Sequence, residues 1–387
     1  MKKILFVTAR YPWPIITGDA LRAYNQIKEL ARNNTVDVFS LEHIPEVRGD
    51  IDEFISWNIS GKINKVRKFR NLILNGYDRA IQCAMYADQE SWLSLKKLIG
   101  ENKYDAIIFQ LIRLEYVISK TIVLKYKLNL KAKIYCDYVD ALSLNMASRA
   151  KTEGALMKFI CNRESSKLLA SEQKIYSLVD HSLIISERDA NYIGIGNFKI
   201  LPNGVNIPKH NFEDEHKKLV DMMPPINLVF FGNMGYYPNV NAALFLADIF
   251  QKLTPGKYKL HIVGAQPAKK ILSLKAVDGI MIHGYVENLY DLLSNMDLAV
   301  FPILDGSGLQ NKVLEAFALK LPVITTDIVL ASIPKLKDYA ISANTKEDFI
   351  KEIEAFTLGD VKWNGSVTTA LSILKEEYSW NKITLLV

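Results

Sequence analysis

The sequence has little cysteine and no long apolar run. Its 387 residues include three cysteines, Cys83, Cys136 and Cys161, which are far apart and odd in number. We therefore expect a reducing compartment, with neither a disulfide framework nor a zinc cluster. No apolar stretch reaches the roughly 18 residues that a membrane-spanning helix needs. The opening MKKILFVTARYPWP lacks a small-residue cleavage site, so we expect a buried strand there and not a signal peptide.

A strong charge imbalance is also missing. Charged residues make up 23% of the chain, and the formal net charge is +6. This mild excess fits an anionic small-molecule substrate or an anionic membrane surface, and it fits nucleic acid only weakly. One local run, residues 61–70, has no acid and is interpreted either as a solvated face or as a contact with an anionic membrane. Its five cations are Lys62, Lys65, Arg67, Lys68 and Arg70.

Short apolar runs alternate with longer stretches of helical pattern from end to end. Runs that are apolar almost throughout are typical of parallel strands buried on both faces. Ten runs are predicted as strands: 4–8, 36–41, 104–110, 132–137 and 181–186 in the first half, and 226–232, 258–264, 279–284, 297–303 and 321–326 in the second. Because the segments between them are long enough for crossover helices, we predict an α/β fold of two doubly wound, Rossmann-like domains.

A linker divides the chain. Residues 201–225 combine an Asn-Gly pair, several prolines and a charged, aperiodic middle. We predict an N-terminal domain at 1–205, a C-terminal domain at 206–370, and a closing helix at 371–387 that packs back towards the N-terminal domain. Another helical stretch, 140–179, should break at Gly154. Ligands of doubly wound sheets bind outside the carboxyl ends of the strands, so a cleft between the domains is the expected active site.

The stretch GSGLQNKVLEAFALKLPVITTD, residues 306–327, carries the clearest chemistry. A glycine-rich turn follows a predicted strand and leads into a helix that should begin near Leu309. Free backbone N–H groups and the positive end of this helix can bind an anion. Lys312 can meet a phosphate, and Glu315, on the same face, can accept hydrogen bonds from ribose hydroxyls. The alternative is a solvated ion pair between these two side chains on an amphipathic helix.

This stretch, LPNGVN at 201–206 and LVFFGNMGYYPNVNA at 228–242 together resemble a known class of enzyme, in the right order along nearly the whole chain. They resemble GT-B nucleotide-sugar glycosyltransferases, and specifically retaining glycosyltransferase family 4. A TxRxPxPxxxGDxxR opening at 8–22 and DYVDALS at 137–143 are similar to its exopolysaccharide-associated sugar transferases. The resemblance implies that a hexosyl group moves from a nucleoside-diphosphate sugar to a glycan or lipid-linked acceptor, with retention, in bacterial surface polysaccharide synthesis.

The resemblance also implies roles for individual residues. Glu315 matches the family acid that binds the nucleotide ribose, and Gly18 lies in a loop that approaches the donor diphosphate in related enzymes. Two departures stand out: Ser307 replaces a frequent acid, and Asn233 stands where many members have an arginine, with no lysine following. We therefore expect Lys312 to supply the missing cation and to act in catalysis. The donor phosphates and sugar are assigned to Gly306, Ser307, Gly308, Leu309, Gln310, Asn311 and Lys312, with Asn233 beside them.

The N-terminal domain is expected to bind the acceptor. Arg22, Asp137 and Asp140 are the candidates on this side, and Asp140 is the candidate catalytic residue that orients or deprotonates an acceptor hydroxyl. Simpler interpretations stay open. Asp137 and Asp140 can form a strand-end turn and a helix N-cap, and Asp19 can be an N-cap.

No metal and no cofactor besides the donor is expected, because no Asp-x-Asp stands at the end of a predicted strand. The expected partners are the donor, a glycan or lipid-linked acceptor and an anionic membrane, but no nucleic acid. The protein would be cytoplasmic and peripheral at the inner face of the plasma membrane. His261 and His283 are interpreted as structural.

Three other functions are alternatives to sugar transfer. A nicotinamide oxidoreductase needs a G-x-G-x-x-G turn after a first strand, and neither domain opens with one. A sugar-nucleotide epimerase of similar fold and a non-catalytic sugar-nucleotide-binding module remain as alternatives.

Overall fold

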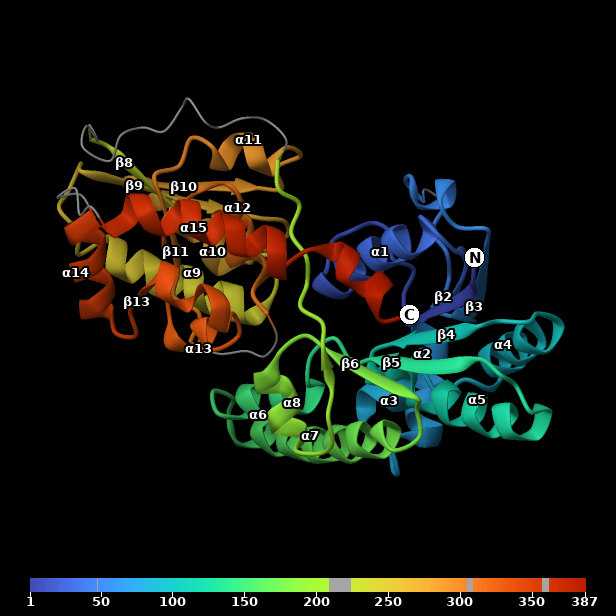
Figure 1. The fold of residues 1–387 in the computed structure, drawn as a ribbon. Coiled ribbons are helices and arrows are strands. Elements are labelled where there is room, and N and C mark those ends of the chain that lie inside the picture. Colours follow the sequence, from blue (N-terminus) through green and yellow to red (C-terminus); the bar gives the residue numbers. More distant parts are fainter. Residues whose placement is uncertain (47, 209–223, 305–308, 357–361) are drawn as a thin grey trace. The chain divides into compact units, whose positions relative to one another are not determined.

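A computed structural model describes residues 1–46, 48–208, 224–304, 309–356 and 362–387. The chain forms two compact units, drawn in Figure 1. Unit 1 comprises Met1–Asn203 and Trp380–Val387, and unit 2 comprises Gly204–Ser379. The chain therefore leaves unit 1 once and returns to it at its C-terminal end.

Unit 1 is built on a seven-stranded parallel sheet in the order β3-β2-β1-β4-β5-β6-β7. Its strands are β1 (Lys3–Thr8), β2 (Thr35–Glu42), β3 (Trp57–Ile63), β4 (Ala106–Gln110), β5 (Lys133–Asp137), β6 (His181–Ile184) and β7 (Lys199–Ile200). Its helices are α1 (Gly18–Ala31), α2 (Lys65–Asn75), α3 (Ile81–Met85), α4 (Gln89–Glu101), α5 (Glu115–Leu128), α6 (Leu142–Ala150), α7 (Ala155–Tyr176) and α8 (Glu187–Ile193), with 3-10 helices η1 (Ile51–Glu53), η2 (Ile112–Leu114) and η6 (Trp380–Leu385).

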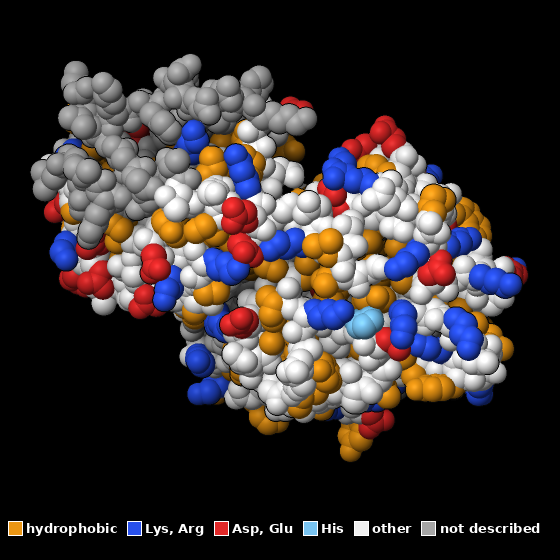
Figure 2. Space-filling view, viewed as in Figure 1, with side chains coloured by type: hydrophobic (Ala, Val, Ile, Leu, Met, Phe, Trp, Pro, Cys, Tyr) orange, Lys and Arg blue, Asp and Glu red, His pale blue; other side chains and the backbone are white. Residues whose placement is uncertain are grey.

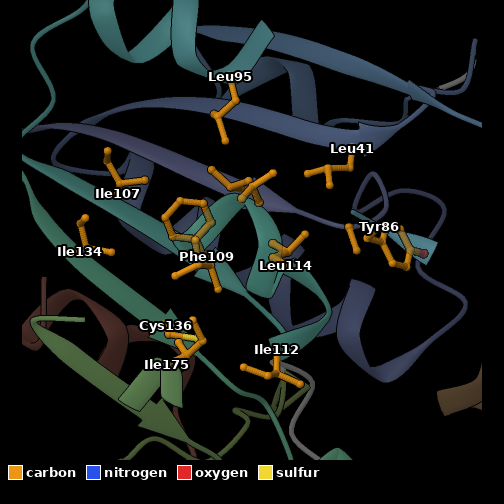
Figure 3. Close-up of a cluster of buried hydrophobic side chains, with 14 of the residues drawn as sticks. Leu41, Tyr86, Leu95, Ile107, Phe109, Ile112, Leu114, Ile134, Cys136 and Ile175 are labelled. Atoms are coloured by element: carbon orange, nitrogen blue, oxygen red, sulfur yellow. The ribbon is translucent and has the colours of Figure 1, made fainter. Parts of the chain in front are cut away.

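Helices cover both faces of this sheet, which explains why its strands are apolar almost throughout. Leu5 and Val7 of β1 point into a core shared with α4, α5 and α7, part of which Figure 3 shows around Phe109. Ile4 and Phe6 point into a second core shared with α1 and η6. Because successive side chains of a strand alternate between faces, a strand with two buried faces shows no polar alternation.

Unit 2 repeats the arrangement with a six-stranded parallel sheet in the order β10-β9-β8-β11-β12-β13. Its strands are β8 (Ile226–Phe231), β9 (Tyr258–Val263), β10 (Ile280–Gly284), β11 (Leu298–Phe301), β12 (Val323–Thr325) and β13 (Ile341–Ser342). Its helices are α9 (Tyr237–Phe250), α10 (Lys269–Leu272), α11 (Leu289–Leu293), α12 (Asn311–Ala318), α13 (Asp327–Leu330), α14 (Lys346–Phe356) and α15 (Lys362–Glu377), with 3-10 helices η4 (Ser273–Ala276) and η5 (Pro334–Tyr339).

The predicted pair of doubly wound α/β domains is confirmed, and each of the ten predicted runs contains a strand. Three strands were missed. β3 is an edge strand, interrupted by Gly61 and partly exposed, so it lacks the apolar run of a central strand. β7 and β13 have only two residues each. The three cysteines are buried and unpaired.

The helix predictions are partly right. Gly154 is the N-cap of α7, so the predicted break is confirmed. A single closing helix was wrong, because α15 ends at Glu377 and η6 follows it in the other unit. α12 begins at Asn311, slightly later than Leu309. Among the described residues, no helix combines the length and the apolar character that spanning a bilayer requires.

A chain of polar side chains crosses the sheet of unit 2. His261 Nδ1 on β9 lies 3.0 Å from His283 Nε2 on β10, and His261 Nε2 lies 3.2 Å from Asn227 Oδ1 on β8. Asn227 Nδ2 donates to Asp297 Oδ2 at 3.0 Å, so Asn227 Oδ1 is left as an acceptor. His261 then donates from Nε2 and accepts at Nδ1 from His283. This pattern needs the His261 imidazole neutral, because its Nδ1 must accept a hydrogen bond.

We expect this pair to make the stability of unit 2 depend on pH. Burial, with His283 and Lys259 nearby, lowers the pKa of His261 to about 4. The contribution is therefore fully present above the ordinary histidine pKa of about 6.5 and is lost as the pH falls towards about 4. Wild-type protein should lose up to about 3 kcal/mol more unfolding free energy over this range than His261→Gln, measured by urea denaturation at several pH values. Equal losses would contradict the assignment.

Candidate active site

The candidate site in unit 2 is built around the start of α12, which follows β11 at the carboxyl edge of the sheet. Gln310 is the N-cap residue, Leu309 is buried, and Asn311 opens the helix. Lys312 and Glu315 follow within the first turns. Gly306, Ser307 and Gly308 lie outside the described residues, so their predicted contacts with the donor stay predictions.

Lys312 is buried, with 8% of its surface exposed. Its Nζ donates to Asn239 Oδ1 and lies 5.3 Å from the centre of the Phe230 ring, within the range of a cation–π interaction. Asn239, on the first turn of α9, in turn donates from Nδ2 to the backbone carbonyl of Asn233 at 2.9 Å. A lysine from α12 is thus held against the loop that joins β8 to α9.

The backbone of this loop allows the lysine to approach closely. Gly232 has a φ of +146°, a conformation that side-chain-bearing residues rarely adopt. A Cβ at Gly232 would lie 3.0 Å from Asn239 Nδ2 and 3.4 Å from Lys312 Cε. Asn233 closes the turn, since its Oδ1 accepts from the backbone N–H of Gly235 at 2.9 Å. The predicted donor-binding Asn233 therefore shapes the loop beside the lysine.

The electrostatics of the pair differ from those of a surface ion pair. Burial lowers the pKa of Lys312 to about 7, partly offset by the negative charge of Glu315. Burial likewise raises the pKa of Glu315 to about 7, partly offset by Lys312. Lys312 is buried and Glu315 is half-buried, and an anion placed beside Lys312 would favour its charged form. The alternative of a solvated ion pair does not describe this lysine.

Three neighbours of the pair were missed from the sequence. Asn239 and Phe230 contact Lys312. Burial and the negative charge of Glu315 raise the pKa of the Tyr290 phenol on α11. Asn239 could have been found as the amide one turn into the helix after the loop glycine. Because the amide of Asn239 carries no charge, a pattern based on charged residues does not indicate it.

In unit 1, the acceptor-side candidates Arg22 and Asp137 form a buried ion pair, and both side chains are 0% exposed. Arg22 Nε lies 2.7 Å from Asp137 Oδ2, and Arg22 Nη2 lies 2.9 Å from Asp137 Oδ1. Arg22 Nη1 donates to the carbonyl of Leu201 and to Asn203 Oδ1. The pair joins α1 and β5 to the segment that leads out of unit 1 at Asn203. Because neither side chain is exposed, an acceptor cannot contact them in this arrangement. Losing either partner would strand a buried charge, at a cost of about 3–5 kcal/mol.

Asp140 lies between β5 and α6 and is partly exposed. The N-cap alternative for it is wrong, because Ala141 is the N-cap residue of α6. A carboxylate from another helix serves this helix start instead: Glu172 accepts from the backbone N–H of Ser143 at 3.2 Å. Burial raises the pKa of Glu172 to about 7, with hydrogen bonds from Ser143 lowering it and the charge of Asp140 raising it within that value. Asp140 itself stays a candidate for contact with an acceptor.

The loop after β1 ends in a helix start that is open to solvent. Thr17 is the N-cap residue of α1, so the N-cap interpretation of Asp19 is wrong. Asp19 lies in the first turn, and its Oδ2 accepts from Arg10 Nη2 at 2.6 Å. Gly18 is exposed, and a Cβ there would meet no atom within 4 Å. The space beside Gly18 is therefore open. The predicted role of Gly18 in donor binding stays a prediction.

The two Rossmann-like units give the fold of GT-B glycosyltransferases, as comparison with solved structures shows. The chain is similar to sucrose-phosphate synthase from Thermosynechococcus elongatus, with a TM-score of 0.70 and 13% identity over 100% of this chain and 97% of that one. It is similar to HepE from Anabaena in complex with UDP-glucose, with a TM-score of 0.66 and 12% identity over 100% and 98%. It is also similar to WaaG, a glycosyltransferase involved in lipopolysaccharide biosynthesis, with a TM-score of 0.62 and 13% identity over 98% of each chain.

Sequence comparison adds one finding at the level of a family. Residues 225–357 match the family model described as glycosyl transferases group 1. The match covers most of unit 2, including the β8–α9 loop and α12. A search of curated proteins finds no match.

Proposed function

We propose that the protein is a glycosyltransferase that takes its sugar from a nucleoside-diphosphate sugar. The observation that carries the proposal is the buried Lys312, held by Asn239 against the β8–α9 loop, with Glu315 one turn along the same helix. The match of residues 225–357 to glycosyl transferases group 1 supports it, because it covers all these residues.

The roles proposed follow from charge and position. Glu315 accepts hydrogen bonds from the ribose, and Lys312 together with the N-terminus of α12 holds the diphosphate. Negative charge grows on that diphosphate as the sugar leaves, so a cation fixed there stabilises the transition state more than the ground state. Unit 1 holds the acceptor, with Asp140 as the candidate that orients its hydroxyl. Holding both substrates in line supplies the rest of the rate.

The transferred sugar, the stereochemistry and the acceptor are proposed as follows. We propose transfer of a hexosyl group with retention at the anomeric carbon, as the resemblance to family 4 implies. The acceptor is a glycan or lipid-linked sugar of a bacterial surface or exported polysaccharide, and the protein works at the inner face of the plasma membrane. The similarity to WaaG, involved in lipopolysaccharide biosynthesis, supports this setting. The similarity to HepE, seen with UDP-glucose, makes uracil the first base to test.

The test is release of nucleoside diphosphate from a panel of nucleotide sugars, with and without a membrane extract that supplies acceptors. We expect release from one donor and an increase when acceptor is present. Conversion of the donor into an isomeric sugar nucleotide without acceptor would identify an epimerase instead. Donor binding without release under either condition would identify a non-catalytic module.

Turnover should not require a divalent metal. The helix N-terminus and Lys312 already supply positive charge where the diphosphate is proposed to bind, so a metal ion would add little there. We expect activity in excess chelator to stay within about twofold of the untreated rate. The check compares chelated enzyme with the same enzyme after manganese or magnesium is added back. Loss of activity that either ion restores would contradict this prediction.

A further inference from the structure

Helix α2 of unit 1 presents apolar side chains to solvent. Val66, Phe69 and Ile73 are 76%, 66% and 67% exposed, and their spacing of three and four residues puts them on one face. Leu74 in the last turn and Tyr77 just after the helix add to this exposed apolar surface, at 71% and 87% exposure. We call these five side chains the α2 stripe. Such a continuous apolar surface on a single helix marks an interaction site.

The opposite side of α2 is polar and turned inward. Asn71 is the helix's buried residue, at 2% exposure, and its Nδ2 donates to the carbonyl of Met85 at 3.2 Å. A helix that stabilises a core normally buries its apolar face and exposes its polar one. Folding of unit 1 alone therefore does not explain why the stripe is apolar.

Of the five cations at residues 61–70, three form ion pairs and two are exposed beside the stripe. Arg67 Nη1 lies 2.8 Å from Glu90 Oε2, Lys68 Nζ lies 2.6 Å from Glu42 Oε1, and Arg70 Nη2 lies 3.2 Å from Asp88 Oδ1. Lys62 and Lys65 are exposed at the N-terminal end of the stripe. Three of the five cations are therefore engaged with acidic side chains of unit 1, and contact of the run with a membrane stays a prediction. On the face that Figure 2 shows, Lys and Arg side chains are likewise scattered among acidic and apolar ones.

A neighbouring helix also exposes large apolar side chains. Arg163 and Lys167 of α7 donate to the carbonyl of Tyr77, so α7 runs beside the turn that follows α2. One turn before Arg163, Phe159 is 68% exposed, and Leu156 precedes it at 74%. Two helices of unit 1 thus carry large apolar side chains at their exposed faces.

We propose that the α2 stripe docks into the interfacial region of an anionic membrane. The helix from Lys65 to Asn75 contains no acid, and Lys62 and Lys65 flank the stripe, which is complementary to lipid phosphates. Large aliphatic and aromatic side chains next to lysines are the composition of helices that lie in a membrane interface. The proposal rests on the proposed function, because a lipid-linked acceptor would lie in the same interface.

Vesicle sedimentation tests this proposal with matched variants. Wild-type protein is mixed with vesicles of neutral lipid alone and with vesicles containing an anionic lipid. We expect preferential binding to the anionic vesicles, and a loss of about 10- to 100-fold in partitioning for the double variant F69S and I73S. The double variant V123S and Y126S removes exposed side chains from α5 of the same unit and should bind as wild type. K62Q with K65Q should remove the preference for anionic vesicles.

Other outcomes would overturn the proposal. Absence of vesicle binding by the wild type, or equal binding by F69S/I73S, would show that the stripe does not meet lipid. A concentration-dependent dimer that F69S/I73S abolishes, without vesicle binding, would identify a second copy of the chain as the occupant. Nucleotide binding and donor hydrolysis, measured without vesicles, should be unchanged in F69S/I73S. Failure of the membrane proposal is thereby distinguished from failure of the proposed function.

Discussion

Lys312→Ala is expected to lower turnover by about 100- to 1,000-fold, or about 3–4 kcal/mol, the effect of losing one preorganised donor to a developing negative charge. Lys312 is buried at 8% exposure, with its ammonium fixed by Asn239 and Phe230, so it pays little to reorganise when a diphosphate arrives. Burial also strengthens its interaction with an anion, because water screens that interaction less. A surface ion pair with Glu315 would contribute only about 0.2–1 kcal/mol to stability and nothing to catalysis.

A lysine at the other end of the same helix provides the matched control. Lys320 follows α12, has a φ of +58° and is partly exposed. Lys320→Gly removes a positive charge without backbone strain and should keep turnover within about threefold of wild type. Melting temperatures establish that both variants fold. If Lys312→Ala also stays within about threefold while Asn233→Ala abolishes turnover, the phosphates bind elsewhere and the role of Lys312 is wrong.

Glu315→Gln should weaken nucleotide binding by about 10- to 100-fold without unfolding the protein. A carboxylate accepts two charge-assisted hydrogen bonds from ribose hydroxyls, and an amide can replace only one of them, more weakly. Stability should not fall, because burial raises the pKa of Glu315 to about 7 and a neutral side chain removes that unfavourable charge. The measurement combines titration calorimetry with thermal unfolding.

Glu347→Gln on α14 is the control for the loss of one negative charge in unit 2, since Glu347 is exposed. It should leave nucleotide affinity unchanged. Unchanged affinity in Glu315→Gln as well would show that this carboxylate does not meet the ribose. A large fall in melting temperature would show instead that Glu315 is needed for the fold.

The fold could be predicted because strands buried on both faces show themselves in the sequence. β1 is such a strand, with Leu5 and Val7 in one core and Ile4 and Phe6 in the other. Edge strands lack this signature, which is why β3 was missed.

The site could be predicted only in part, because its contacts join residues far apart in the sequence. The position of Lys312 after a glycine-rich turn indicated an anion site. Its partner Asn239 lies 73 residues away, and the partners Arg22 and Asp137 lie 115 residues apart. The sequence around α2 shows cations without acids, but three of these cations form ion pairs with acids elsewhere in unit 1. Such pairs cannot be seen in the local sequence.

Equilibrium titration with nucleoside diphosphates tests the central claim most directly, which is that unit 2 binds a sugar donor through Lys312 and Glu315. The wild type and the double variant of Lys312→Ala with Glu315→Gln are titrated with each diphosphate and with the corresponding nucleoside. We predict that one diphosphate binds the wild type, that its nucleoside binds far more weakly, and that the double variant loses the preference for the diphosphate. Equal affinity of the double variant and the wild type for every diphosphate would contradict this account.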